Sequence, residues 1–279
     1  MEGSYKSLVI KILQKLDASP LRKYGQNFLI SPSIISKLSR LIKDFQKKTQ
    51  AKILFEIGPG FGFLIDKVFE RDLPIVGIEL DSKLANYLRE KYSEYKEIQI
   101  EHADATKFDL AQLNRVLIYG NIPYNISSKI VDAICKNRSK IASALVMFQL
   151  EFANRLTSQD GSKQFGSLSV LAQLFYQVKK VFTISKENFW PVPNVTSSLV
   201  TFVPLNDNFQ SDYDSISKIL RICFGMRRKT LYNNIRSSRL IYKDFLLDFF
   251  SQYGLLSERA EKIPLEIWKT LFKKMSRQI

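Results

Sequence analysis

The chain lacks most of the residues from which disulfide frameworks and metal sites are built: 279 residues include two cysteines and one histidine. Cys135 and Cys223 have no metal-ligand spacing, so neither a disulfide framework nor a metal site is expected. No apolar run is long enough to span a membrane, and the N-terminus lacks the apolar stretch of a signal peptide. These absences predict a cytoplasmic protein that binds neither metal nor membrane.

The positive charge is concentrated at the two ends of the chain. The formal net charge is +15, of which residues 1–50 carry +7 and residues 206–279 carry +6, whereas the residues between carry only +2. Two basic flanks around a near-neutral centre are typical of a protein that grips a polyanion. A nucleic acid is therefore the expected partner, with a generally basic surface as the alternative.

The centre of the chain predicts a mostly parallel sheet. Short β-branched or aromatic runs alternate there with helical patterns. The last two runs lie close together, which suggests an antiparallel edge. We predict an α/β, Rossmann-like seven-stranded sheet with strands at Lys52–Ile57, Ile75–Glu79, Ile98–Glu101, Val116–Gly120, Ile141–Phe148, Val178–Ile184 and Ser198–Val203.

The first strand runs into the glycine-rich segment 58–62. Gly58 and Gly60 allow a tight turn and a close approach of the backbone to a ligand. A dinucleotide-binding fingerprint needs a further glycine where this chain has Phe63, which weakens the case for a pyrophosphate. The pattern suits a nucleoside cofactor without phosphate, such as S-adenosylmethionine (SAM).

One acidic residue follows each of the next two strands. Glu79 ends the second strand, where a carboxylate can accept hydrogen bonds from both hydroxyls of a ribose. Asp104 follows the third strand and is placed to meet the adenine amine of the same cofactor. Capping of the next helix is the alternative role for both. Because the glycine turn lies at the same edge of the sheet, we favour ligand binding.

The fourth strand ends in a tetrapeptide suited to a planar amine. Asn121 offers a side-chain carbonyl, Pro123 frees the neighbouring backbone from strand pairing, and Tyr124 offers a flat face for stacking. Two acceptors beside a flat face are what methyl transfer to N6 of adenine requires. An ordinary Asn-x-Pro turn is the alternative.

Together these segments resemble the KsgA-type rRNA adenine N6,N6-dimethyltransferases from Leu21 to the end of the chain. Residues 25–29 are similar to that family's GQNFL motif, which implies that Asn27 and Leu29 contact SAM. The resemblance gives the same role to Gly58, Glu79, Asp104 and Asn121.

Two further segments resemble motifs of that family. Residues 189–195 are similar to its F-x-P-x-P-x-V loop, which implies that Phe189 is a second aromatic wall opposite Tyr124. Residues 227–231 are similar to its RRKTL segment, which implies RNA contacts by Arg227, Arg228 and Lys229. The chain departs from the family at Ile122, where Leu is usual, and at residues 194–197, where Lys-Val-Asp-Ser is usual.

Downstream of the sheet, apolar residues at helical spacing predict a small helical domain. Its expected buried face consists of Ile216, Ile219, Leu220, Cys223, Phe224, Leu231 and Ile235, with helices over Tyr242–Tyr253 and Pro264–Met275. We predict an N-terminal extension at 1–20, a SAM-binding catalytic domain at 21–204 and an all-α RNA-binding domain at 205–279.

The resemblance implies SAM-dependent methylation of N6 on two adjacent adenosines in a 3′-terminal hairpin of 16S rRNA. The expected partner is that rRNA within an assembling small ribosomal subunit, and the enzyme is expected to be a monomer. Two alternatives stay open. One is an erythromycin-resistance-type methyltransferase of large-subunit rRNA, in which Ile at the position of Ile122 is common. The other is a non-catalytic ribosome-assembly factor.

Overall fold

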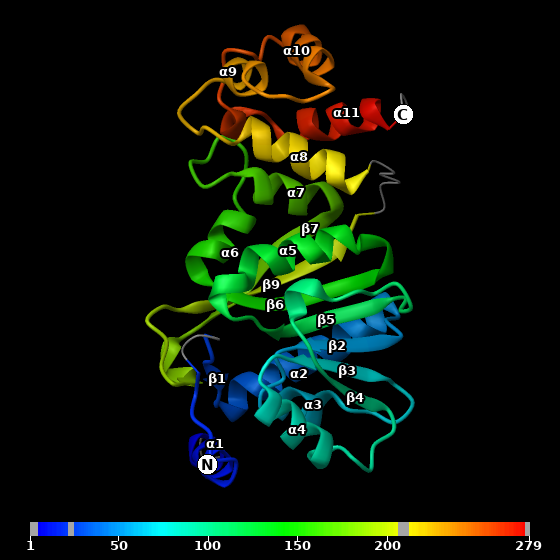
Figure 1. Ribbon diagram of the computed structural model, residues 1–279, viewed down its shortest axis with the longest axis vertical. Helices are drawn as coiled ribbons and strands as arrows, with labels where there is room; N and C mark the ends of the chain where they lie inside the picture. The colour runs from blue at the N-terminus through cyan, green and yellow to red at the C-terminus, as the bar shows by residue number, and fades with distance from the viewer. Residues whose placement is uncertain (1–4, 22–24, 206–211, 277–279) are drawn as a thin grey trace. The chain divides into compact units, whose positions relative to one another are not determined.

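The computed structural model describes residues 5–21, 25–205 and 212–276, which divide between two compact units (Figure 1). The first unit comprises Met1–Ala153 and Lys179–Pro204, and the second comprises Asn154–Val178 and Leu205–Ile279. The predicted catalytic domain ran without a break from 21 to 204, whereas this division by contacts groups Asn154–Val178 with the C-terminal helices.

The main sheet has seven strands in the order β4-β3-β2-β5-β6-β9-β7, which confirms the predicted fold class. β2 to β6 pair in parallel, and β9 pairs antiparallel to β6. All seven predicted strands are present, with ends that shift by one or two residues at most. Their bounds are β2 Ile53–Ile57, β3 Ile75–Glu79, β4 Ile98–His102, β5 Val116–Asn121, β6 Ile141–Gln149, β7 Tyr176–Ile184 and β9 Ser197–Pro204.

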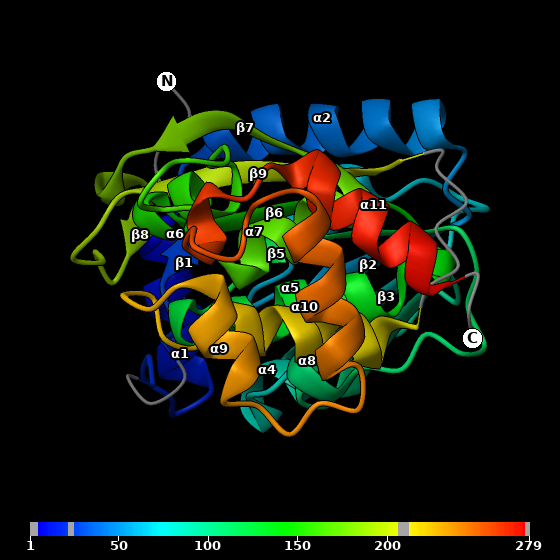
Figure 2. The same ribbon diagram turned by 90° about the horizontal axis from the view of Figure 1, so that it is seen from above.

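Helices cover both faces of this sheet because β2 and β5 are apolar on both sides. On one face, α2 (Pro32–Thr49), α3 (Phe63–Val68) and α4 (Ser82–Lys91) share a single apolar core with the strands. α5 (Ser127–Lys136) lies on the opposite face from α2 (Figures 1 and 2). Two short 3-10 turns, Ala105–Lys107 and Tyr124–Ile126, follow β4 and β5.

The N-terminal extension contains a helix, α1 (Lys6–Lys15), that packs within the first unit. Its buried Val9 and Leu13 join a small apolar cluster with Ile30, Phe61 and Leu84. A separate two-stranded ribbon, which was not predicted, forms where β1 (Phe28–Leu29) pairs antiparallel with β8 (Phe189–Trp190). The ribbon therefore holds the last two residues of the segment 25–29.

The second unit is helical and is built around Trp268, which is fully buried. The ring of Trp268 lies 5.7 Å from that of Phe224 and 5.4 Å from that of Phe250, measured between centroids. All seven residues of the predicted apolar face are buried. The helices are α6 (Leu150–Leu156, at the boundary between the units), α7 (Ser167–Phe175), α8 (Tyr213–Cys223), α9 (Leu231–Arg236), α10 (Lys243–Gln252) and α11 (Leu265–Met275). Among the described residues, no helix combines the length and apolarity needed to cross a membrane.

Gly120, near the end of β5, permits the close packing of β5 on β2 at the edge where the strands end. Its φ is +153°, and a Cβ atom there would lie 2.3 Å from the carbonyl oxygen of Ile57. Cβ atoms in proteins essentially never lie within 3.0 Å of such a neighbouring atom, and here the neighbour belongs to the backbone of a central strand. No side chain larger than hydrogen fits at this position without moving β2.

We therefore expect Gly120→Ala to destabilise the protein by about 3 kcal/mol or more, or to prevent folding. Denaturant unfolding measures the loss. Gly166→Ala is the matched control because Gly166 has an extended backbone and a Cβ there would meet nothing nearer than 3.9 Å. We expect a change of about 0.5 kcal/mol or less for that control. Equal stabilities of the two variants would contradict this account of the β2–β5 contact.

Candidate active site

A pocket of about 1090 Å³, including space open to solvent, lies at the carboxyl ends of the parallel strands. Its walls come from residues 25–29, 56–61, 78–80, 103–105 and 121–124, which are far apart in the sequence. This is the edge at which open α/β sheets bind ligands. The structure brings together there all but one of the predicted catalytic and cofactor-binding residues: Asn27, Leu29, Gly58, Gly60, Glu79, Asp104, Asn121, Pro123 and Tyr124.

The glycine turn after β2 is tied to the acidic residue of the next strand. The backbone N–H of Gly60 donates to Glu79 Oε2 at 3.0 Å, and the backbone N–H of Asp81 donates to Glu79 Oε1 at 3.0 Å. These bonds hold the carboxyl group of Glu79 in one orientation. Burial raises the pKa of Glu79, and the two hydrogen bonds oppose that shift.

The alternative of helix capping applies differently to the two predicted acids. Asp81, and not Glu79, is the N-cap of α4, since its side chain accepts from the N–H groups of Lys83 and Leu84. The carboxyl group of Glu79 is therefore not the cap of α4. Asp104 does cap the 3-10 turn after β4 through a 2.8 Å bond from the N–H of Thr106, and this bond lowers the pKa of Asp104. Asp104 also lines the pocket.

Asn121, the last residue of β5, is oriented by the N-terminal segment. Its side-chain Nδ2 donates to the backbone carbonyl of Asn27 at 2.7 Å. Because that partner can only accept, the nitrogen of the amide must face Asn27, and the side-chain oxygen is left as an acceptor. Asn27 is itself held by a 3.1 Å bond from its Nδ2 to the carbonyl of Gly25.

Two residues that hold parts of the pocket in position were not predicted from the sequence. Gln26 Nε2 donates to Asp81 Oδ2 at 3.1 Å, which fastens residues 25–29 to the start of α4. The buried hydroxyl of Ser197 lies 2.9 Å from the hydroxyl of half-buried Tyr124 and fixes the outer end of that ring. Gln26 lay within the quoted GQNFL-like motif, whereas nothing in the spacing of Ser197 pointed to Tyr124.

Phe189 is the predicted site residue that the structure does not bring to the pocket. It is 1% exposed, pairs with Leu29 in the two-stranded ribbon, and packs in the main apolar core. In this arrangement it cannot form an aromatic wall opposite Tyr124. The physical reason is the alternation of the ribbon: Phe189 points into the core, while Trp190 packs with the cluster around α1.

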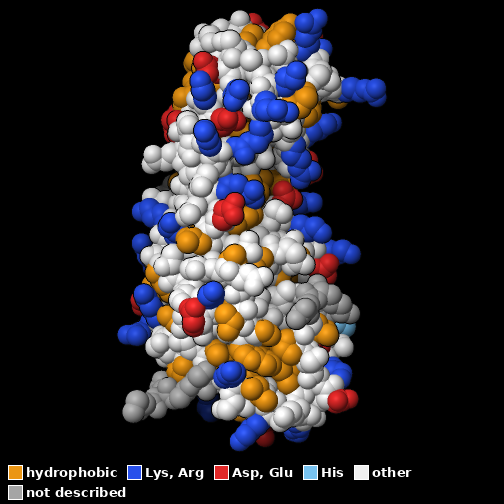
Figure 3. Space-filling model, turned by 90° about the vertical axis from the view of Figure 1, so that its left-hand side faces the viewer, with side chains coloured by type: hydrophobic (Ala, Val, Ile, Leu, Met, Phe, Trp, Pro, Cys, Tyr) orange, Lys and Arg blue, Asp and Glu red, His pale blue; other side chains and the backbone are white. Residues whose placement is uncertain are grey.

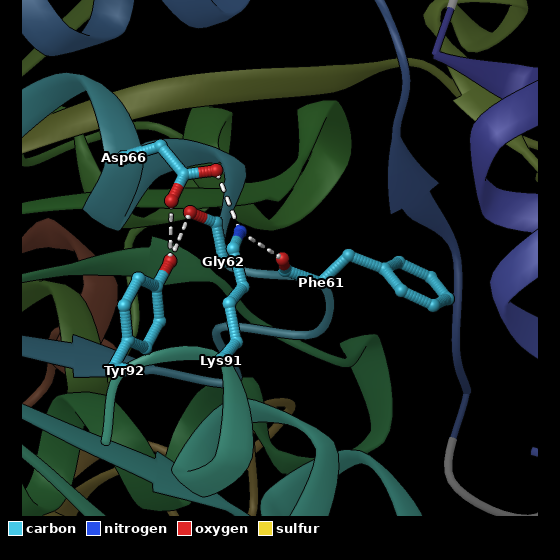
Figure 4. Close-up of polar contacts among 5 residues, drawn as sticks. All are labelled: Phe61, Gly62, Asp66, Lys91 and Tyr92. Carbon is cyan, nitrogen blue, oxygen red and sulfur yellow. Dashed lines mark hydrogen bonds and ion pairs between the residues drawn. The ribbon is translucent and has the colours of Figure 1, made fainter. Parts of the chain in front are cut away.

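The glycine turn is also held by side chains that do not line the pocket (Figure 4). The hydroxyl of Tyr92 lies 2.9 Å from the carbonyl oxygen of Gly62 and 2.7 Å from Asp66 Oδ1. Lys91 Nζ donates to the carbonyl of Phe61 at 3.1 Å and forms a 2.6 Å ion pair with Asp66. Two backbone carbonyls of the turn are thus fixed by the end of α4, which keeps the pocket floor rigid.

Glu56 forms part of that floor and was left out of the predicted site. It is 2% exposed. Burial raises the pKa of Glu56 to about 8, and a side-chain hydrogen bond with Tyr119 opposes this shift. The pocket lining contains Glu56, Glu79 and Asp104 but no Lys, Arg or His from the described part of the chain.

The predicted RNA-contacting residues belong to the second unit. Arg227, Arg228 and Lys229 are exposed in the turn between α8 and α9. The guanidinium of Arg227 donates to the backbone carbonyl of Lys163, so this side chain also braces its own unit.

Comparison with known proteins gives a consistent result over nearly the whole chain. Residues 20–275 match the family described as "Ribosomal RNA adenine dimethylase". The chain is 32% identical over 272 residues to "Ribosomal RNA small subunit methyltransferase A" of Malacoplasma penetrans, covering 96% of each chain. It is 34% identical over 254 residues to the protein of that name from Chlorobium phaeobacteroides, covering 91% of this chain and 93% of that one.

Solved structures share the fold. A dimethyladenosine transferase from Plasmodium falciparum superposes with a TM-score of 0.72 at 24% identity, covering 90% of this chain and 98% of that chain. The 23S rRNA methyltransferase ErmE superposes with a TM-score of 0.63 at 22% identity, covering 90% of this chain and 100% of that chain. At these identities the likeness concerns architecture alone.

Proposed function

Because the chain belongs to the ribosomal RNA adenine dimethylase family, we propose that its pocket binds SAM and that Asn121 and Tyr124 hold the target adenine. The chain is an rRNA adenine methyltransferase. The observation that carries the assignment of the site is the bond from Asn121 to the Asn27 carbonyl, which leaves the amide oxygen of Asn121 as an acceptor at the pocket.

The residues present fit a cationic nucleoside cofactor. Among the described residues that line the pocket, every charged side chain is acidic. Such a lining suits a sulfonium or an ammonium group and disfavours a phosphate. Glu79, fixed by Gly60 and Asp81, retains lone pairs for ribose hydroxyls, and Asp104 retains a carboxylate oxygen for an adenine amine. Residues 27–29 would cover the ligand from the other side. When bound, SAM supplies a methyl group activated by its sulfonium.

The chain's own contribution to the transfer is orientation. The amide oxygen of Asn121 accepts one N–H of the adenine N6 amine, and a backbone carbonyl beside Pro123 accepts the other. The Pro123 carbonyl already accepts from the N–H of Ile126 at 3.1 Å, so the Ile122 carbonyl is the better candidate. Two acceptors direct the nitrogen lone pair away from the protein and toward the methyl group. Stacking on Tyr124, with its hydroxyl held by Ser197, fixes the plane of the base.

We propose small-subunit rRNA as the substrate, with two adjacent adenosines in a 3′-terminal hairpin of 16S rRNA each dimethylated during small-subunit assembly in the cytoplasm. Relatives above 30% identity are named for the small ribosomal subunit. ErmE, a 23S rRNA methyltransferase, shares only the architecture at 22% identity. A monomer carries both the pocket and the basic helical unit needed for this reaction.

The basic segment between α8 and α10 is the surface proposed to meet the RNA. From residue 216 to residue 243 the chain contains no acidic side chain. Several exposed Lys and Arg side chains can be seen in the upper part of Figure 3, where the second unit is drawn. Exposed Tyr232 lies under the guanidinium of Arg236, with 5.7 Å from Cζ to the ring centroid. Arginine and aromatic groups interleaved in this way suit phosphates and unstacked bases.

Methyl transfer from labelled SAM to small subunits that lack the modification tests the function, with large-subunit RNA assayed alongside. We expect dimethyladenosine in the small-subunit RNA. In Asn121→Ala we expect a rate lower by about 100-fold or more at saturating SAM, because an oriented acceptor is lost. Label in large-subunit RNA would overturn the substrate. If no RNA is labelled but the protein binds the small subunit tightly, the remaining explanation would be a non-catalytic assembly factor.

Removing two charges from the basic turn should weaken RNA binding. We expect Arg228→Ala with Lys229→Ala to lower the salt dependence of small-subunit RNA binding by about one counterion per lost phosphate contact. Lys47→Ala with Lys48→Ala, at the exposed end of α2, removes the same charge from the first unit and is the control. Equal losses from the two double variants, measured by filter binding across salt concentrations, would show a general charge effect instead.

A further inference from the structure

We propose that the loop 157–166, between α6 and α7, is a second RNA-binding segment of the helical unit, and that the side chain of Lys163 binds a phosphate of the RNA there. This inference rests on the proposed function and adds a new segment to its RNA-binding surface. Lys163 precedes Arg227 of the basic turn by 64 residues. The surface that meets the RNA is then composed of two segments that the fold brings together.

The basic turn at 226–229 has a fixed backbone. The N–H of Lys229 donates to the carbonyl of Met226 at 2.9 Å, which closes the turn around the two arginines. Asn234, which is 3% exposed, accepts from the N–H of Met226 at 3.1 Å. Its Nδ2 donates to the carbonyls of Cys223 at 3.0 Å and Met226 at 3.3 Å. A turn held in this way presents its cations to a phosphate without first having to be ordered.

The loop 157–166 is also held at both ends, although its middle is exposed. Near its start, Nε2 of Gln173 donates to the carbonyl of Ser158 at 2.9 Å. At its end, the hydroxyl of Ser169 accepts from the N–H of Gly166 at 3.1 Å. Loops positioned by a rigid scaffold are typical of binding surfaces, because a rigid loop loses little conformational entropy when a ligand binds.

The loop and the turn contact each other within the second unit. The guanidinium of Arg227 donates to the backbone carbonyl of Lys163. The ring of Phe165, which is fully buried, lies 6.5 Å from that of Phe224 just before the turn, measured between centroids. Figure 1 shows both segments on the left-hand side of this unit, the side that faces the viewer in Figure 3. Lys163 and the basic turn are therefore parts of one surface.

The exposed side chains of this surface suit an RNA backbone. Lys163, Arg228 and Lys229 are exposed cations, and Gln164 is an exposed hydrogen-bond donor next to Lys163. Lysine, arginine and glutamine side chains all contact phosphate oxygens in nucleic-acid complexes. The guanidinium of Arg227 is already bonded to the loop, so this side chain holds the two segments together.

The loop also contains one exposed acid, Asp160, so its own net charge is zero. The loop therefore contributes a local contact through Lys163 and not a long-range attraction of the polyanion. A local contact predicts that removal of Lys163 removes one phosphate contact, whereas removal of an exposed lysine elsewhere in the chain does not.

Filter binding of small subunits that lack the modification, measured across salt concentrations, tests the contact. We expect the slope of log affinity against log salt to fall by about 0.7 to 0.9 in Lys163→Ala, the change for one phosphate contact. The substitution keeps the backbone carbonyl that Arg227 binds, so the loop stays in place. Lys48→Ala, which removes an exposed lysine of the first unit, is the control and should change the slope much less. A slope for Lys163→Ala equal to that of the wild type or of Lys48→Ala would overturn the proposal.

Photo-crosslinking gives a second readout that does not depend on charge. Cys135 and Cys223 are fully buried, so a cysteine introduced at an exposed position can be labelled selectively with an azidophenacyl group. We expect labelled Gln164→Cys to cross-link to small-subunit RNA and labelled Lys48→Cys to give no cross-link. If Gln164→Cys cross-links only to a protein of the subunit, or to nothing, RNA is not the partner of this loop.

The same experiments separate failure of this proposal from failure of the proposed function. If the wild-type protein methylates the RNA and Arg228→Ala with Lys229→Ala weakens binding, but Lys163→Ala binds as the wild type does, only the role of the loop fails. If the wild-type protein neither binds nor methylates small-subunit RNA, the proposed function fails, and the role of the loop fails with it.

Discussion

The hydrogen bond from the Asn121 amide to the Asn27 carbonyl joins the two parts of the chain that form the site. Asn121 is fixed by the central sheet, whereas residues 25–29 reach the pocket from outside it. That segment is held by the β1–β8 ribbon, by α1 and by the bond from Gln26 to Asp81. The orientation of the Asn121 amide thus depends on elements that lie far from β5 in the sequence.

A second feature of the pocket is that it contains acidic side chains but no basic side chain from the described residues. Glu56 and Glu79 are both buried and both have raised pKa values, although the chain as a whole has a formal net charge of +15. The positive charge lies in the two flanks of the chain, +7 in residues 1–50 and +6 in residues 206–279, and the second of these flanks is the proposed RNA-binding surface. We therefore propose that the protein separates two electrostatic tasks, with an acidic pocket for a cationic cofactor and a basic surface for RNA.

The sequence allowed the fold to be predicted closely because β-branched and apolar runs mark strands that are buried on both faces. The meeting of these glycines and acids in one pocket was also predictable, since strand ends of a parallel sheet converge on one edge. Phe189 was misplaced because its orientation depends on pairing with Leu29, a contact far apart in the sequence. Gln26 and Ser197 act through tertiary contacts that no local spacing reveals.

The most direct test of the central claim is the single-turnover rate of methyl transfer in Asn121→Asp. Aspartate keeps the size of the side chain and offers an acceptor oxygen, but it cannot donate to the Asn27 carbonyl. If that bond orients the acceptor, the rate at saturating SAM falls by about 100-fold or more. A rate close to that of the wild-type protein would show that an acceptor at this position suffices without its attachment to Asn27, and would contradict the account.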